Sequence, residues 1–176
     1  DGRLWRIIPS QKYVSVDYST DYGKSFGQAI RLNPTDMPIH LWDENPPAIS
    51  VDREGRVYVL YFADDQQSST SFFSHSDNGT LFSAPIKISS EANTWYHYQT
   101  EMLVDAKNRI HFIWHDTRDR AEYKKQGGGD LSIYHASAKT KTIEAPFSDQ
   151  RIAKNICSCC RTAMAEDVDG NLVILA

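Results

Sequence analysis

Three cysteines and one arginine stand together near the end of the chain, and these residue types are well suited to metal or thiol chemistry. Cys157, Cys159 and Cys160 fall within four positions, directly before Arg161. Thiolates bind zinc or copper(I), and His97 is a possible further ligand. Three ligands so close in sequence rarely form a tetrahedral site alone, and an odd count leaves one thiol out of any internal disulfide. We therefore expect a disulfide or buried thiols here, with no metal and no cofactor.

An aromatic run surrounds His97, which lies between Trp95-Tyr96 and Tyr98. Aromatic rings offer apolar faces with polar edges, so this run is suited to stacking against a sugar. Packing in the protein interior is the alternative, and we favour it for this run. A second group, Asp116 and Arg118, stands in a polar stretch where the two side chains are expected to pair and order a long loop.

A short segment that recurs along the chain indicates how these residues are positioned. The octapeptide at 19–26 returns in altered form at 75–82 and again, nearly erased, at 136–143. An aspartate in such a turn accepts backbone N–H groups, and a glycine takes the left-handed conformation. The interval of roughly 60 residues is typical of repeat architectures. The residues expected to hold the first two turns are Ser19, Asp21, Gly23 and Phe26, and then Asp77, Gly79 and Phe82. The third copy lacks the acid and the glycine, so that turn must be held differently.

A second repeat interleaves with the first, at 47–61, 100–114 and 162–175. Its three copies align an aspartate and, three positions later, a glycine or asparagine. Each copy predicts a β-hairpin: an apolar strand, a tight turn and a longer β-rich strand. The aligned residues are Asp52, Asp105 and Asp167, with Gly55, Asn108 and Gly170.

Two hairpins in each repeat make four antiparallel strands, which is the pattern of a β-propeller blade. The sequence thus predicts an all-β fold, and residues 1–176 are expected to form a single partial β-propeller domain of about three blades. The predicted units are a half blade at 1–45, blades at 46–97 and 98–158, and a half blade at 159–176.

Composition excludes several classes of function. The chain has 176 residues, of which 40% are hydrophobic, and a formal net charge of -4. It has no Lys/Arg run of the length that nucleic-acid binding needs, so we expect no nucleic-acid partner. It also has no apolar run long enough to span a membrane. The first residue is Asp1 rather than Met, so we expect a mature form or a fragment.

The octapeptide at 19–26 resembles the Asp-box, or BNR repeat, of the sialidase-like β-propellers. Residues 51–59, around Asp52 and Gly55, are similar to the segment between Asp-boxes in that superfamily, and so are residues 114–134. The resemblance covers nearly the whole chain. It implies that the octapeptide turns lie on the face opposite the pocket, so that the pocket is built by 33–47, 62–70, 90–100, 115–131 and 153–162.

A sialidase grips the substrate carboxylate with three arginines and uses a tyrosine nucleophile with carboxylic acids. The resemblance therefore implies catalytic candidates at Asp43, Asp64 and Asp116, and substrate-binding candidates at Arg118, Arg161, Trp42, His97 and Tyr98. The family's N-terminal Arg-Ile-Pro signature is interrupted, because Arg6 is followed by Ile7-Ile8-Pro9. This departure puts the first arginine in question.

Two function classes follow from the resemblance. We favour an extracellular binding or scaffold propeller that takes a glycan or protein ligand on the loop face, because Asp-boxes are structural turns. The alternative is a sialidase-type exo-glycosidase acting on terminal sugars. In either case we expect a secreted or periplasmic location. Three blades leave sheet edges open, so we expect further blades from the same parent chain, or a second copy, to complete a six-bladed ring.

Overall fold

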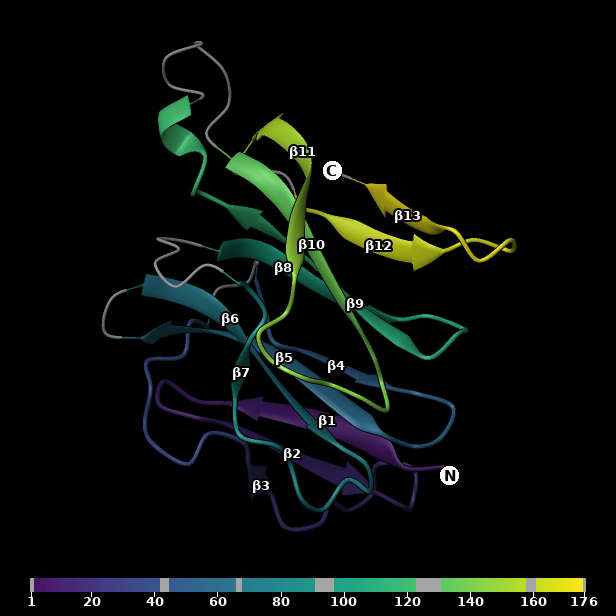
Figure 1. Ribbon diagram of the computed structural model, residues 1–176. Helices are drawn as coiled ribbons and strands as arrows, with labels where there is room; N and C mark the ends of the chain where they lie inside the picture. Colours follow the sequence, from purple (N-terminus) through teal and green to yellow (C-terminus); the bar gives the residue numbers. More distant parts are fainter. Residues whose placement is uncertain are drawn as a thin grey trace.

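The fold is all-β and is shown in a computed structural model (Figure 1). The structure describes residues 2–41, 45–65, 68–90, 97–122, 131–157 and 161–175. A short helical turn at 120–122 interrupts the strands. Within these ranges no helix has the length and apolarity required to cross a bilayer.

The strands form four antiparallel sheets that follow one another in chain order, from purple to yellow in Figure 1. The first sheet contains β1 (Leu4–Pro9), β2 (Val14–Ser19) and β3 (Ile30–Arg31). The second contains β4 (Ala48–Val51), β5 (Val57–Asp65), β6 (Ser68–Ser76) and β7 (Ile86–Lys87). The third contains β8 (His97–Val104), β9 (Arg109–Asp116), β10 (Leu131–Lys139) and β11 (Asp149–Ile156). The last is the hairpin of β12 (Ala163–Glu166) and β13 (Leu172–Leu175).

The strands β4, β8 and β12 begin their sheets and lie side by side, as the inner strands of neighbouring sheets. The prediction of four-stranded antiparallel sheets is confirmed for the second and third. The first sheet differs, because β1 adds a strand that the repeats did not predict. The repeats consist of paired hairpins, and β1 has no hairpin partner before it in the chain, so their spacing does not predict it.

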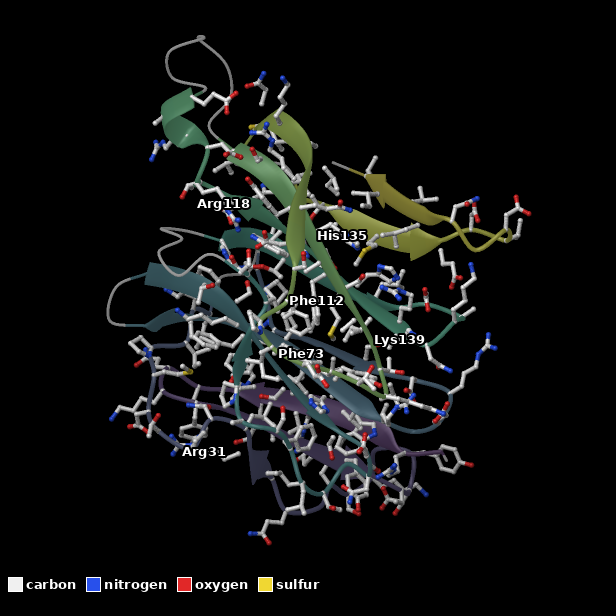
Figure 2. The ribbon with its side chains drawn as sticks, viewed as in Figure 1. Arg31, Phe73, Phe112, Arg118, His135 and Lys139 are labelled. Carbon is white, nitrogen blue, oxygen red and sulfur yellow. The ribbon has the colours of Figure 1, made fainter. Side chains whose placement is uncertain are left out.

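Two apolar clusters hold the sheets together. One lies between the first and second sheets and includes Val16, Val59 and Tyr61. The other lies between the second and third sheets, where Phe73 meets Phe112 edge to face with ring centroids 5.0 Å apart (Figure 2). The last hairpin is covered less well: Leu175 is 71% exposed. Burial of these rings supplies much of the driving force for the sheet stack.

The three Asp turns have the same geometry, as the second repeat predicts. In each, one aspartate oxygen accepts the backbone N–H groups two and four residues later, at 2.7–3.0 Å. The third residue after the aspartate has positive φ in every copy: Gly55, Asn108 and Gly170 at 83°, 57° and 79°. An asparagine tolerates this region better than other residues with a side chain, which explains the substitution at 108.

The octapeptide turns are held by side chains, with one correction. Asp21 accepts hydrogen bonds from the Ser19 and Ser25 hydroxyls, both at 2.6 Å, and Gly23 has φ 85°. In the second copy the acceptor was expected at Asp77. It is Asn78, which accepts the backbone N–H and the hydroxyl of Thr80 at 2.8 and 2.7 Å. The reason is that the second turn is one residue shorter, so the acceptor shifts by one position.

The third turn, at 139–142, is held differently, as expected. Thr140 donates both its backbone N–H and its hydroxyl to the carbonyl oxygen of Asn108, at 3.0 Å each. This turn is therefore tied to the neighbouring β8–β9 turn rather than to an acid of its own.

Candidate functional site

Three of the predicted site residues, His97, Asp116 and Arg118, come together between the second and third sheets. Asp116 ends β9 and is fully buried. Its carboxylate accepts hydrogen bonds from the Trp114 indole at 2.9 Å and from the Arg118 guanidinium and backbone N–H at 2.8 Å each. Burial raises the pKa of Asp116, but the contacts with His97 and Arg118 outweigh it and hold the pKa far below its usual range. Such a carboxylate is poorly suited to donate a proton, so the catalytic role stays a prediction.

His97 begins β8 and is fully buried against Trp114. Its Nδ1 accepts the backbone N–H of Ser71 at 3.2 Å, so the proton of the neutral ring lies on Nε2. That nitrogen lies 3.4 Å from Asp116 Oδ2, an electrostatic contact rather than a well-aligned hydrogen bond. Burial, opposed by Asp116, lowers the pKa of His97, which favours the neutral ring. For His97, packing in the protein interior therefore fits better than stacking against a sugar.

Arg118, labelled in Figure 2, contacts strands of the third sheet and donates to Ser89, which follows the last strand of the second sheet. Its guanidinium lies 3.8 Å over the Tyr134 ring, and it donates to both oxygens of Asp149 at 3.2 Å and to the Ser89 hydroxyl at 2.9 Å. Burial lowers the pKa of Arg118, and its hydrogen bonds to Asp116 and Asp149 raise the pKa by more. The guanidinium that was predicted to bind a substrate carboxylate is thus already hydrogen-bonded to two carboxylates of the protein, Asp116 and Asp149.

A separate pocket lies among the beginnings of the inner strands, with a volume of about 170 Å³. It is lined by Asn45, Pro46, Pro47, Ala48, Gln99, Thr100, Glu101 and Arg161. We call it the inner-strand pocket. Hydrogen bonds join its walls: Asn45 Oδ1 accepts the Thr100 backbone N–H at 3.1 Å, and Thr162 Oγ1 donates to the Gln99 carbonyl at 2.8 Å. Segments from three sheets therefore meet at this pocket.

Glu101 and Arg161 form the charged part of the inner-strand pocket. Their closest atoms, Oε1 and Nη2, are 4.0 Å apart, and their side chains are 32% and 57% exposed. Burial raises the pKa of Glu101, while the charge of Arg161 lowers it by less. Glu101 therefore keeps its proton to a higher pH than an ordinary glutamate does, which suits a hydrogen-bond donor or a general acid.

Asn45 forms part of the wall of the inner-strand pocket. Its side chain is buried, and its Oδ1 is oriented by the Thr100 N–H. Its Nδ2 has no hydrogen-bond partner in the described part of the chain. This nitrogen is enclosed by protein atoms, so the contribution of Asn45 to the pocket is the hydrogen bond that joins its walls.

A β-bulge in β8 directs Glu101 to the inner-strand pocket. Tyr98 pairs with His115, but Glu101 rather than Thr100 pairs with Ile113, so one extra residue stands in β8. Gln99 has φ 48° at this point. Bulges often re-aim side chains in this way. Regular alternation would have placed Glu101 opposite Phe112, in the apolar interface.

Of the remaining predicted site residues, the structure describes the side chain of Arg161 but not those of the other four. Arg161 lies in the inner-strand pocket as a candidate, and Glu101 was missed by sequence reasoning. Trp42 and Asp43 lie outside the described residues. Asp64 and Tyr98 belong to β5 and β8, but their side chains lie outside the description.

The cysteine segment is described only at its beginning. Cys157 is exposed, so the expectation of a buried thiol is wrong for this residue, and Cys159 and Cys160 lie outside the described ranges. Among the residues that the structure places, no group of three or more His, Cys, Asp or Glu side chains is arranged to hold a metal.

Comparison with known proteins supports the fold. No family model matches the chain. It is 25% identical over 134 residues to the lactonase drp35 of Staphylococcus haemolyticus (strain JCSC1435), covering 76% of this chain and 38% of the lactonase. An alpha-L-arabinanase of Penicillium chrysogenum, solved with arabinobiose, matches with a TM-score of 0.61 and 11% identity, over 99% of this chain and 54% of the arabinanase.

A protein of unknown function from Dyadobacter fermentans DSM 18053 matches with a TM-score of 0.53 and 13% identity, over 86% of this chain and 38% of that protein. The chain thus spans about half or less of the length of these proteins. The likeness supports a β-propeller arrangement of the four sheets.

Proposed function

We propose that this chain is part of a carbohydrate-active β-propeller that binds a glycan in the inner-strand pocket. The observation that carries the proposal is that the Glu101 carboxyl and the Arg161 guanidinium face one pocket built by segments from three sheets. Sugar hydroxyls donate and accept hydrogen bonds at once, so a mixed set of donors and acceptors suits them. Likeness in fold to an arabinanase solved with arabinobiose adds support by analogy.

The size of the pocket fits one small polar unit. Its volume of about 170 Å³ lies below the roughly 300–1,000 Å³ of sites for drug-sized ligands. We infer that a single sugar unit occupies it and that the rest of a glycan extends over the loop face. A glycan or protein ligand on that face was also the expectation from sequence.

The direct test is calorimetric titration of the protein with arabinobiose and, for comparison, with cellobiose. We expect Arg161→Ala and Glu101→Gln each to weaken binding by about tenfold, the loss of one charged hydrogen bond. Arg53→Ala is the control, because Arg53 lies beyond the other end of β4. Binding that these two pocket variants leave unchanged would refute the proposed site.

Glycoside hydrolysis is the second candidate function, and the raised pKa of Glu101 favours it. In this function Glu101 protonates the leaving-group oxygen as the glycosidic C–O bond breaks, while water adds to the sugar carbon and gives its proton to a second carboxylate. Glu101 is the only acid in the described lining of the pocket, so the second carboxylate comes from outside that lining. A fluorogenic arabinofuranoside and a fluorogenic sialoside serve as substrates, with Glu101→Gln as the variant expected to lose activity. Turnover of neither substrate, together with intact glycan binding, leaves the binding function and rejects hydrolysis of these two substrates.

The sialidase type is a narrower form of this second candidate. It requires three arginines around the substrate carboxylate, and Arg118 is already paired with Asp116 and Asp149. The side-chain contacts of Asp21 support an Asp-box turn at 19–26. The Asp-box type, the six-bladed ring, the blade boundaries and a secreted or periplasmic location remain parts of the proposal. The mass of the protein in solution tests whether further blades or a second copy complete the ring.

A further inference from the structure

A hollow lined by cations lies at the end of the third sheet, away from the inner-strand pocket. Its volume is about 430 Å³, and its lining residues are Lys107, Asn108, Arg109, Lys139, Thr140 and Lys141. We call it the basic turn site. Glu101 stands before the end of β8, whereas Lys107 stands in the turn beyond that end, so the two sites occupy different parts of the strand's length.

The fold brings the four cations together through strand pairing. Lys139 and Arg109 are directly opposite partners in β10 and β9, so their side chains project from the same face of the sheet. The hydrogen bonds from Thr140 to the Asn108 carbonyl join the two turns that carry Lys107 and Lys141. Figure 2 shows Lys139 at the end of β10 remote from Arg118.

The four cations of the basic turn site outnumber the two carboxylates that flank it, Glu54 and Glu166. Lys107 and Lys139 form no ion pair within the described ranges, and Lys141 reaches Glu54 only at 3.6 Å with 68% of its side chain exposed. The nearby Asp105 is engaged with the backbone of its own turn. Like charges held close together in a chain of net charge -4 favour an anionic ligand.

Comparison of the three octapeptide turns gives an independent reason to expect an anion site at the third turn. The first turn carries an acid, Asp21, and the second an amide, Asn78, and both are acceptors within their own turns. The third turn has Lys139 and Lys141 instead, and Thr140 ties it down through Asn108. The hydrogen bonds of Thr140 hold this turn, and its two lysine side chains stand beside the hollow.

We propose that the basic turn site binds the sulfate or carboxylate groups of an acidic polysaccharide. Exposed lysines act as point charges without fixed geometry, so they suit a polymer with repeated charges better than one small anion held in a rigid cradle. The choice of a polysaccharide among polyanions rests on the proposed glycan function, whereas the anion site itself does not. The site is separate from the inner-strand pocket, so each site is expected to bind its own ligand independently of the other.

The experiment compares dextran sulfate with unsulfated dextran, and adds a polyuronate to separate sulfate from carboxylate recognition. Binding is measured at low salt and again at rising NaCl concentrations. We expect dextran sulfate to bind, with an affinity that falls as salt rises, and dextran not to bind. Lys139→Glu combined with Lys141→Glu should weaken binding by about tenfold or more. The matched control is Lys24→Glu with Lys154→Glu, which makes the same change in net charge on exposed residues elsewhere.

Three results overturn the proposal: no binding of dextran sulfate or polyuronate at low salt, equal weakening by the control pair, or displacement by inorganic sulfate far beyond that by NaCl of equal ionic strength. The last result would assign the site to a small anion. Arg161→Ala should leave dextran sulfate binding unchanged, and the double lysine variant should leave arabinobiose binding unchanged. Failure of one site is thereby distinguished from failure of the other.

Discussion

Arg118 and Arg161 are alike in the sequence, since each follows a run of reactive residues in a predicted loop, but the fold uses them in opposite ways. Arg118 is 16% exposed and paired with two buried carboxylates. Arg161 is 57% exposed and lies 4.0 Å from one half-buried glutamate. The first arginine holds two sheets together, and the second lines a pocket. An arginine near an acidic side chain thus says little about function until its partners and its burial are known.

Replacement of Arg118 by methionine should have the largest effect. The variant leaves Asp116 and Asp149 buried without their cation, and loss of one partner of a buried ion pair costs about 3–5 kcal/mol. Urea unfolding monitored by tryptophan fluorescence measures the change. A loss below about 1 kcal/mol would mean that Arg118 is not the structural arginine of this comparison.

His115 lies in the same strand as Asp116, but its buried ring has no hydrogen-bond partner within the described residues, so it tests the cost of burial alone. It is fully buried, neither ring nitrogen has a hydrogen-bond partner in the part that the structure describes, and burial lowers its pKa to about 4. Because the folded-state pKa is depressed, its contribution is complete above about pH 6.5 and is lost as pH falls through 4. The loss is on the order of 3 kcal/mol by pH 4.

His115→Leu should remove this pH dependence and change stability little at pH 7, since no hydrogen bond is lost. Unfolding curves of both proteins from pH 7 to pH 4 provide the measurement. Parallel curves for the two proteins would contradict this account of His115.

Titration of Glu101 should change stability with pH less than that of His115 does, and in the opposite direction. Its folded-state pKa is raised by burial, so its contribution to stability is complete below the usual pKa of a glutamate and is lost as pH rises through the raised value. Glu101→Gln has no such dependence. We therefore expect the difference in stability to move in favour of the variant as pH rises from 4 to 8, as thermal unfolding will show. A shift in favour of the original protein would instead make Glu101 a structural ion-pair partner of Arg161.

Replacement of Arg161 by methionine should have the smallest effect on stability, within about 0.5 kcal/mol, because the side chain is exposed and its pairing is loose. The urea measurement used for Arg118 applies here too. A loss comparable to that of Arg118→Met would remove the distinction between the two arginines.

The sequence was most predictive where a turn needs a particular backbone conformation. Asp52, Asp105 and Asp167 recur with a glycine or asparagine three positions later, and that residue has the expected positive φ in all three turns. The four-stranded sheets followed from the same spacing. β1 was missed because it has no hairpin partner before it in the chain.

The candidate site was less predictable, because it depends on contacts between distant segments. Arg118 is occupied by Asp149, 31 residues away in sequence. Glu101 was missed because period-2 alternation along 97–104 assigns it to the interior, and nothing in the sequence announces the extra residue in β8.

The bulge in β8 makes the length of this segment as important as its composition. His97 and Met102 face the same apolar interface although they are an odd number of positions apart. Deletion of one residue between 98 and 100 would restore regular alternation, turning Glu101 toward Phe112 and Met102 toward Arg161. In an alignment of related chains a one-residue gap at this point would look minor. Physically it exchanges an acid for a thioether at the pocket, and so acts as two substitutions at once.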